Sequence, residues 1–217
     1  MIERIVDAAV ATQETFGPPP ERELFPTERE RIERAVQRRR RDFADVRWCA
    51  RQAMAQLGVP AAAILPGDRG APQWPAGVVG SMTHCEGYRG AAVALAAHVH
   101  GVGIDAEPHG PLPDGVLDVI SLPVEREWLA QAPPGVHWDK LLFSAKESTY
   151  KVWFPLTGRW LGFEDAHISI DPAAGTFTTR LLVPGPVVDG VPLTELRGRW
   201  TTSPELVLTA ISLTAWP

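Results

Sequence analysis

The stretch GVGIDAEP, residues 101–108, places two carboxylates at the end of an apolar run. Asp105 and Glu107 are two positions apart, so in an extended strand their side chains point to the same face, about 7 Å apart along the backbone. Converging carboxylates can divide the roles of acid and base, or can hold a hard cation such as Mg²⁺ beside a phosphate. A solvated strand end would carry the same two residues, so this pair by itself leaves both alternatives open.

A second pair of charges lies in FSAKESTYK, residues 143–151. Glu147 and Lys151 are four positions apart and share one face of the helix that this segment predicts. Such a pair is usually an exposed ion pair that stabilises a helix by roughly a few tenths of a kcal/mol. The neighbouring residues are strongly apolar, however, which indicates a polar pair beside a buried body. The chain keeps only three lysines among 21 basic residues, and they are Lys140, Lys146 and Lys151.

The stretch VVGSMTHCEGY, residues 78–88, offers backbone N–H groups, hydroxyls and an imidazole within a few positions. Thr83 and His84 are of the types that bind phosphate or pyrophosphate oxygens, although a histidine in such a place also serves as a structural hydrogen-bonding group. Cys85 and Cys49 lie far apart and without a CxxC pairing, so we expect neither a disulfide nor a zinc site but two small buried residues.

Arginines are concentrated between residues 29 and 51, where nine of them accompany four acids. Four consecutive arginines, residues 38–41, spread around a helix and predict a solvated surface. Nucleic-acid binding is not expected, because the net charge is −5 and no helix-turn-helix or RNP pattern is present. Arg47 is the better candidate for a specific anion contact, because a guanidinium matches phosphate oxygens.

The composition is that of a globular protein, with 217 residues of which 45% are hydrophobic and 22% charged. A disordered or collagen-like chain is excluded. No apolar run approaches the length of a membrane span, and the first residues lack the features of a signal peptide. We therefore expect a cytoplasmic protein that does not bind membranes.

The elements that must position these residues follow from periodicity and from Gly and Pro. Apolar spacing predicts a long helix over residues 27–57, interrupted in its course and ended by Gly58 and Pro60. Further helices are predicted over residues 115–120, 124–131 and 136–154, with Pro155 preventing continuation of the last one. The segment FGPPPERELFP, residues 16–26, reads as an ordered loop.

Short strands are predicted on either side of these later helices. VVGSMTH, YRGAAVALAA and GVGIDAE precede them, with a turn at His100 and Gly101, and a meander of AHISID, TFTTRLL, ELRGRWTT and LVLTAISL follows. Each half thus passes from helix to antiparallel strands. This predicts an α+β fold of two similarly built subdomains, residues 1–108 and 109–217, divided at the HGPLPDG linker that follows Pro108.

Taken together and in order, the segments WPAGVVGSMTHCEGY, GVGIDAE and FSAKESTYK resemble a 4'-phosphopantetheinyl transferase. The resemblance is to the bacterial subgroup associated with siderophore synthesis and carrier-protein activation, and it spans residues 38 to 153. It implies transfer of the phosphopantetheine arm of coenzyme A to a serine of an acyl, aryl or peptidyl carrier protein, with release of adenosine 3',5'-bisphosphate. It also implies a holo-acyl-carrier-protein synthase type of enzyme, monomeric, with coenzyme A in the cleft between two pseudo-symmetric halves.

The resemblance further implies roles for individual residues. Asp105, Glu107 and Glu147 would ligate Mg²⁺, with Mn²⁺ as the alternative metal, and Glu147 would act as the base. Lys151 would neutralise the departing charge. The remaining residues expected to contact coenzyme A are Arg40, Arg47, Arg69, Thr83, His84 and Lys146. Ala106 stands where some relatives carry a polar residue, and Arg69 where a lysine is commoner.

Two other classes of protein fit the same residues. The carboxylates could hold structure in a non-catalytic protein that binds coenzyme A or a nucleotide, or could serve an Mg²⁺-dependent phosphohydrolase. Consumption of coenzyme A that requires a carrier protein would separate the transferase from both.

Overall fold

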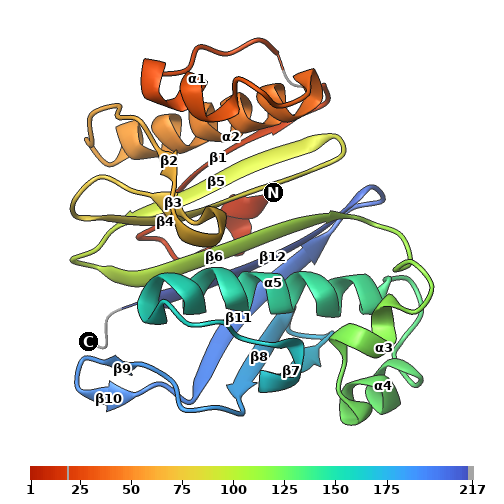
Figure 1. Cartoon of the computed structure of the whole chain (residues 1–217). Coiled ribbons are helices and arrows are strands. Elements are labelled where there is room, and N and C mark those ends of the chain that lie inside the picture. Colours follow the sequence, from red (N-terminus) through yellow and green to blue (C-terminus); the bar gives the residue numbers. More distant parts are fainter. Residues whose placement is uncertain (19, 215–217) are drawn as a thin grey trace.

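The N-terminal half is built on a three-stranded antiparallel sheet in the order β1-β5-β4, as the computed structural model in Figure 1 shows. The structure describes residues 1–18 and 20–214. The strands of this sheet are β1 (Ala11–Phe16), β4 (Val78–Cys85) and β5 (Tyr88–Leu95). The other elements of this half are η1 (Ile2–Arg4), α1 (Pro26–Ile32), α2 (Gln37–Gln56), β2 (Leu65–Pro66), η2 (Asp68–Gly70) and β3 (Pro72–Gln73).

The helix α2 covers one face of this sheet because its apolar residues recur at helical spacing. Cys49, Ala50, Ala53 and Met54 are almost fully buried against Val78, Ala91 and Val93 of the sheet. The predicted interruption of the long helix is confirmed, since α1 ends at Ile32 and α2 begins at Gln37.

The C-terminal half is built on a five-stranded antiparallel sheet in the order β6-β12-β11-β8-β7. Its strands are β6 (Val99–Pro108), β7 (Ala166–Asp171), β8 (Thr176–Leu181), β11 (Glu195–Thr202) and β12 (Leu206–Thr214). The remaining elements are α3 (Val116–Ile120), α4 (Pro123–Leu129), α5 (Trp138–Thr157), η3 (Phe163–Asp165), β9 (Val187–Val188) and β10 (Val191–Pro192). The α+β prediction, with a long helix on an antiparallel sheet in each half, is confirmed.

The helix α5 lies across β6 and β12, as Figure 1 shows, and it approaches β6 very closely. A Cβ atom at Gly103 would lie only 2.1 Å from the carbonyl oxygen of Ser148, so the two backbones meet where no side chain fits. This contact fixes the spacing between α5 and β6.

A shared core joins the two halves. It contains Ile2, Ile5 and Val6 near the start of the chain, Tyr88 and Ala92 of β5, Ile104 and Ala106 of β6, and Leu206 and Leu208 of β12. The N-terminal sheet therefore packs on the C-terminal sheet through a continuous apolar contact.

Four details differ from the sequence-based expectations. The strand β6 was assigned to the N-terminal subdomain, but it pairs with β12 in the C-terminal sheet. The turn before it lies at residues 96–98 instead of at His100 and Gly101, which are inside β6. The strand β1 was not predicted at all. The division into subdomains at residue 108 itself stays a prediction.

The fourth difference concerns Pro155, which does not end α5. The helix continues to Thr157, where Gly158 adopts a left-handed conformation (φ 64°) and its N–H donates to the Phe154 carbonyl. A proline this close to the end removes one hydrogen bond from the last turn only, so the helix absorbs it. None of the helices in the described part of the chain combines the length and the apolar character needed to cross a membrane.

Candidate active site

Asp105 lies at the centre of the charged residues that the sequence singled out. It is 5% exposed, and its Oδ1 atom accepts hydrogen bonds from Lys151 Nζ at 2.8 Å and Thr83 Oγ1 at 3.4 Å. Lys151 Nζ also donates to the Ile104 carbonyl at 2.9 Å. The other carboxylate oxygen, Oδ2, is buried and has no hydrogen-bond partner. An unpartnered buried carboxylate oxygen is costly unless a cation or water binds it.

Two further carboxylates lie within the electrostatic reach of Asp105. Burial raises the pKa of Glu147, and the charge of Asp105 raises it further, while Lys151 lowers it. The pKa of Glu107 is raised by the same two causes and lowered by Lys140, whose Nζ lies 3.6 Å from Glu107 Oε2. Carboxylates are therefore concentrated in one partly buried region, which favours the binding of a cation.

These residues fit a divalent metal ion by their chemistry. All three would supply carboxylate oxygens, the donors that Mg²⁺ and Mn²⁺ prefer, and one of these oxygens is buried without a partner. Over residues 1–18 and 20–214, no three His, Cys, Asp or Glu side chains stand already converged as a ligand set. Glu107 and Glu147 would therefore have to change rotamer to join Asp105 on one ion.

The N-terminal half contributes Thr83 and His84 from the end of β4. His84 is exposed, and partial desolvation by the surrounding protein is the main cause that lowers the pKa of its ring; Asp42 opposes this shift and Lys151 adds to it. The hydroxyl of Thr83 is already used, because it accepts from the Ala106 N–H at 3.1 Å and donates to Asp105. The structure thus brings together Asp105, Glu107, Glu147, Lys151, Thr83 and His84, from both halves of the chain.

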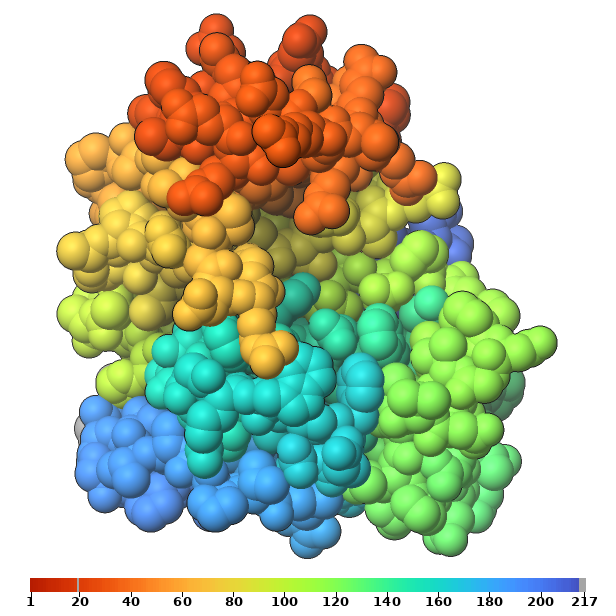
Figure 2. Space-filling view, viewed as in Figure 1, coloured from red at the N-terminus to blue at the C-terminus, as the bar shows by residue number. Residues whose placement is uncertain are grey.

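Arg69 also reaches across the two halves. It lies on an exposed loop with a left-handed backbone (φ 52°), and its guanidinium carbon is 5.1 Å from the ring centroid of Trp160, which follows α5. Figure 2 shows this loop extending onto the surface of the C-terminal half, beside a recess between the halves. A cavity of about 230 Å³ lies elsewhere, between α4 and β7, and the cluster around Asp105 does not line it. The recess between the halves in Figure 2 is called the cleft from here on.

Arg47 and Arg40, both expected at a phosphate, are held by protein groups instead. The Arg47 side chain is almost completely buried, and it donates to the carbonyls of Ile64 at 2.7 Å and Phe43 at 3.2 Å. Burial lowers its pKa to about 10. Arg40 is exposed and donates to the carbonyls of Ala35 and Glu33. The geometry gives neither prediction support.

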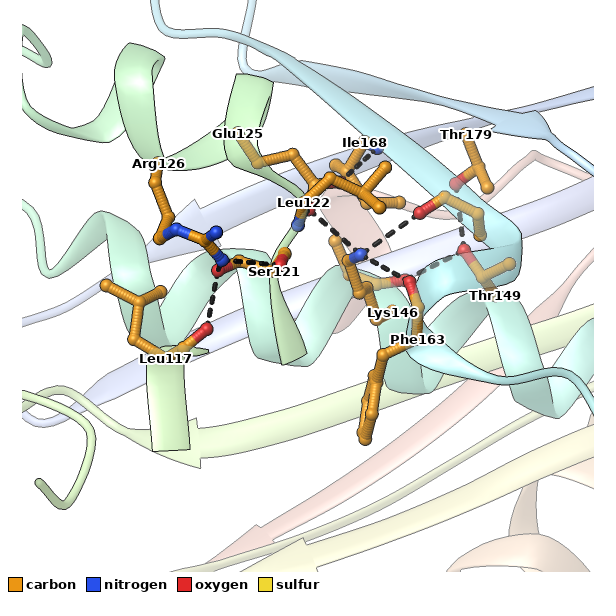
Figure 3. A network of polar contacts seen from close by, with 12 residues as sticks. Leu117, Ser121, Leu122, Glu125, Arg126, Lys146, Thr149, Phe163, Ile168 and Thr179 are labelled. Atoms are coloured by element: carbon orange, nitrogen blue, oxygen red, sulfur yellow. Dashed lines mark hydrogen bonds and ion pairs between the residues drawn. The ribbon is translucent and has the colours of Figure 1, made fainter. Parts of the chain in front are cut away.

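Lys146 is directed toward Glu125 and Phe163 within the C-terminal half, as Figure 3 shows. Its Nζ atom lies 2.9 Å from Glu125 Oε2 and donates to the carbonyls of Phe163 at 2.8 Å and Ala166 at 3.0 Å. Glu125 in turn accepts from the Ile168 N–H at 2.7 Å. The expectation that Lys146 contacts coenzyme A does not match this position, because its three hydrogen bonds are used within the C-terminal half to join α4, α5 and β7.

Two contacts around the site were not anticipated. Lys140 pairs with Glu107, so each of the three lysines in the chain ends on a carboxylate. The clustering of lysines in one helix was the available signal. The buried Arg89 binds Asp42, with its Nε 2.9 Å from Oδ1, and both residues influence the pKa of His84. No local pattern in the sequence indicated that pair.

Comparison with known proteins agrees with this arrangement. The model of the 4'-phosphopantetheinyl transferase N-terminal domain matches residues 27–94, and that of the 4'-phosphopantetheinyl transferase superfamily matches residues 101–188. The two regions meet at the turn between β5 and β6.

Curated relatives match almost the whole chain. The 4'-phosphopantetheinyl transferase Svp of Streptomyces mobaraensis is 56% identical over 99% of this chain and 90% of its own length. The 4'-phosphopantetheinyl transferase Npt of Nocardia iowensis is 53% identical over 98% and 99%, and PptT of Mycobacterium tuberculosis is 54% identical over 94% and 92%. These matches support the transferase over the binding-protein and phosphohydrolase alternatives. The chain belongs to the 4'-phosphopantetheinyl transferases, which transfer the phosphopantetheine arm of coenzyme A to a carrier protein.

Proposed function

We propose that the cluster around Asp105 is the catalytic centre, with Asp105, Glu107 and Glu147 holding Mg²⁺ or Mn²⁺. The observation that carries this proposal is that the two carboxylate oxygens of Asp105 have different surroundings. One of its oxygens is neutralised by Lys151, and the other is buried without a partner and faces no described donor. A bound metal would neutralise the charge of the pyrophosphate.

The reaction assigns distinct tasks to the residues of this chain. The hydroxyl oxygen of the carrier serine attacks the phosphorus that carries the pantetheine arm, and the bond from that phosphorus to the bridging oxygen of coenzyme A breaks. Glu147 accepts the serine proton, directly or through a water, because its raised pKa makes it a stronger base than an ordinary glutamate. Lys151 stabilises the negative charge that remains on the departing adenosine 3',5'-bisphosphate.

Coenzyme A is proposed to lie in the open cleft between the halves. His84 and Arg69 supply exposed cationic or hydrogen-bonding groups from the N-terminal side. The Tyr150 ring, next to Lys151 in sequence, lies 5.7 Å from the Phe154 ring and 5.2 Å from the Trp160 ring, and these rings offer an apolar surface to the pantetheine arm. Thr83 is proposed to position Asp105, because its hydroxyl donates to Asp105 and accepts from the Ala106 N–H of β6.

The carrier is proposed to approach this cleft with an acidic surface, because arginines dominate the exposed part of α1 and the start of α2. Arg29, Arg31, Arg34, Arg38, Arg39 and Arg41 are all exposed there. The protein is proposed to act as a cytoplasmic monomer of the holo-acyl-carrier-protein synthase type, without nucleic acid or membrane. One chain supplies every residue of the cluster, so a monomer is sufficient.

The test is the intact mass of a purified apo carrier protein after incubation with this protein, coenzyme A and Mg²⁺. A gain of one phosphopantetheine arm that EDTA abolishes and added Mg²⁺ restores is the expected result. A gain that persists after complete metal removal would contradict the metal assignment. Steady release of adenosine 3',5'-bisphosphate without a carrier would contradict the assignment of the carrier serine as the acceptor.

A further inference from the structure

Two sheet edges meet beside the active site without a backbone ladder between them. The strand β6 pairs only with β12, and β4 pairs only with β5, so each is an edge strand of its own sheet. The two edges are joined by side-chain hydroxyls of β4. Ser81 Oγ accepts from the Ile104 N–H at 3.1 Å, and Thr83 Oγ1 accepts from the Ala106 N–H at 3.1 Å.

These two amides lie on either side of Asp105. The backbone of Ile104 is held at both of its polar groups, since its N–H donates to Ser81 and its carbonyl accepts from Lys151 Nζ at 2.9 Å. The backbone that carries Asp105 is thus held from the N-terminal half by a hydroxyl and from the C-terminal half by an ammonium. The direction in which Oδ2 points depends on both contacts.

The hydroxyl of Ser81 has no other described partner and no route to solvent. The residue is 3% exposed, its neighbour in β5 is Ala92, and the surrounding core is apolar. Burying a hydroxyl is unfavourable unless it is hydrogen bonded, so an alanine would suit packing alone. The hydrogen bond to the Ile104 N–H explains why a serine, and not an alanine, occupies this buried position.

We propose that Ser81 is a positioning residue for the transfer reaction: through the Ile104 amide it sets the strand backbone that aims Asp105 at the metal. This inference rests on the proposed role of Asp105 as a metal ligand. Ser81 is 3% exposed and its hydroxyl bonds the Ile104 N–H, whereas Thr83 bonds Asp105 directly and precedes His84. Substitution of Ser81 therefore tests the effect of the β6 backbone position separately from that of contacts with coenzyme A.

The test is Ser81→Ala, compared with Thr179→Val as a matched loss of a buried hydroxyl. Thr179 is 0% exposed and bonds only Thr149 Oγ1, at 2.8 Å, between β8 and α5. In Ser81→Ala we expect the Mg²⁺ concentration for half-maximal activity to rise and kcat to fall, each by roughly 3- to 10-fold, as the loss of one buried hydrogen bond allows. The KM for coenzyme A should change less than about twofold, and Thr179→Val should change neither the metal dependence nor kcat.

Two readouts do not depend on turnover. Mn²⁺ binding followed by electron paramagnetic resonance should weaken in Ser81→Ala and not in Thr179→Val. In the wild-type protein the Ile104 amide should be protected from hydrogen exchange, and Ser81→Ala should remove that protection. The wild-type measurement stands even if the variant folds poorly.

Separate outcomes overturn the inference and the proposed function. If Asp105→Asn weakens Mn²⁺ binding but Ser81→Ala binds Mn²⁺ as the wild type does, the positioning role of Ser81 is wrong and the metal site stands. If the Ile104 amide of the wild type exchanges as fast as a free edge amide, the positioning role of Ser81 is also wrong and the metal site stands. If Asp105→Asn leaves Mn²⁺ binding unchanged, the metal assignment of Asp105 fails first.

Discussion

Lys151 Nζ lies 2.8 Å from Asp105 Oδ1, so the ammonium group from α5 neutralises one oxygen of a carboxylate whose other oxygen has no partner. The contact joins a helix to the edge strand that it crosses, at the level where Gly103 lets the two backbones meet. One carboxylate thereby has one oxygen that the protein satisfies and one buried oxygen that no described group satisfies.

Replacing Glu147 with glutamine should lower kcat by roughly 10²–10⁴-fold, because the amide keeps the shape but cannot accept the serine proton. Coenzyme A binding, measured by calorimetry, should change much less. The control is Glu127→Gln on the exposed side of α4, which should transfer at the wild-type rate. Near-normal turnover of the Glu147 variant would mean that another group is the base.

In the metal-free protein Glu147 should titrate above the ordinary glutamate pKa of 4.5, because burial and Asp105 raise the pKa of Glu147. The base must be ionised, so the activity of the metal-loaded enzyme should be lost as pH falls, with a midpoint below the pKa of the metal-free carboxyl because the bound cation favours the ionised form. Removal of the neighbouring charge in Asp105→Asn should lower the pKa of Glu147. A ¹³C-detected titration of the metal-free proteins measures both values, and a Glu147 pKa at or below 4.5 in the wild type would contradict this account.

In the absence of metal, the contribution of Glu107 and Glu147 to the free energy of unfolding should fall as pH rises, whereas activity rises with pH. The folded protein binds protons on Glu107 and Glu147 more readily than the unfolded chain, because both pKa values are raised in the folded state. Their contribution to the free energy of unfolding therefore falls as pH rises from the unfolded value through the folded one. Added Mg²⁺ should recover that loss. Denaturant melts across this range, with Glu107→Gln as the comparison, check both statements.

Removing the charge of Lys146 should destabilise the fold by about 3–5 kcal/mol, since Lys146→Met leaves the buried Glu125 carboxylate without its partner. The double variant Lys146→Met/Glu125→Gln should lose less stability than the sum of the single variants. Coenzyme A affinity of folded Lys146→Met should stay within about threefold of the wild type. A large loss of affinity at full folding would restore Lys146 to the coenzyme A site.

An alanine at Gly103 should abolish most activity, because its Cβ atom would meet the Ser148 carbonyl at 2.1 Å and force α5 away from β6. The displacement would begin one residue after Glu147. Gly101→Ala is the matched control on the same strand, where the nearest atom to an added Cβ is Val152 Cγ1 at 3.2 Å. Gly103→Ala should have a lower Tm and a lower transfer rate than Gly101→Ala. Equal values for the two variants would mean that the close contact at Gly103 does not limit the spacing of α5 and β6.

The sequence predicted the elements well wherever local signals decide them. Gly58 and the spacing of apolar residues in α2 indicated that helix, and Glu147 with Lys151 shared the face of α5 that meets β6. Lys146 could have been excluded from the cleft by the same periodicity, because consecutive residues on a helix point about 100° apart. The neighbours of Glu147 in sequence are therefore not its neighbours in the site.

The remaining errors concern contacts between distant segments. The pairing of β6 with β12 joins residues 99–108 to residues 206–214, and no local signal indicates which of two apolar strands a third one will join. The strand β1 has weak alternation and gains its stability from β5. The burial of Arg47 depends on Ile64 and Glu28, which reach it from loops and from α1. Residue type alone therefore indicated an anion contact, whereas in the structure the Arg47 guanidinium donates to protein carbonyls and lies beside Glu28.

The shared core has a consequence for the order in which the chain folds during synthesis. Ile2, Ile5 and Val6 share one core cluster with Leu206 and Leu208, so residues made early are covered only after residues far along the chain have been made. The N-terminal sheet and α2 have local contacts enough to form early, and β6 covers much of the second apolar face of the sheet, but the rest of that face stays uncovered until β12 is made. A nascent chain released before about residue 206 would expose that face, and would depend on chaperones or be degraded.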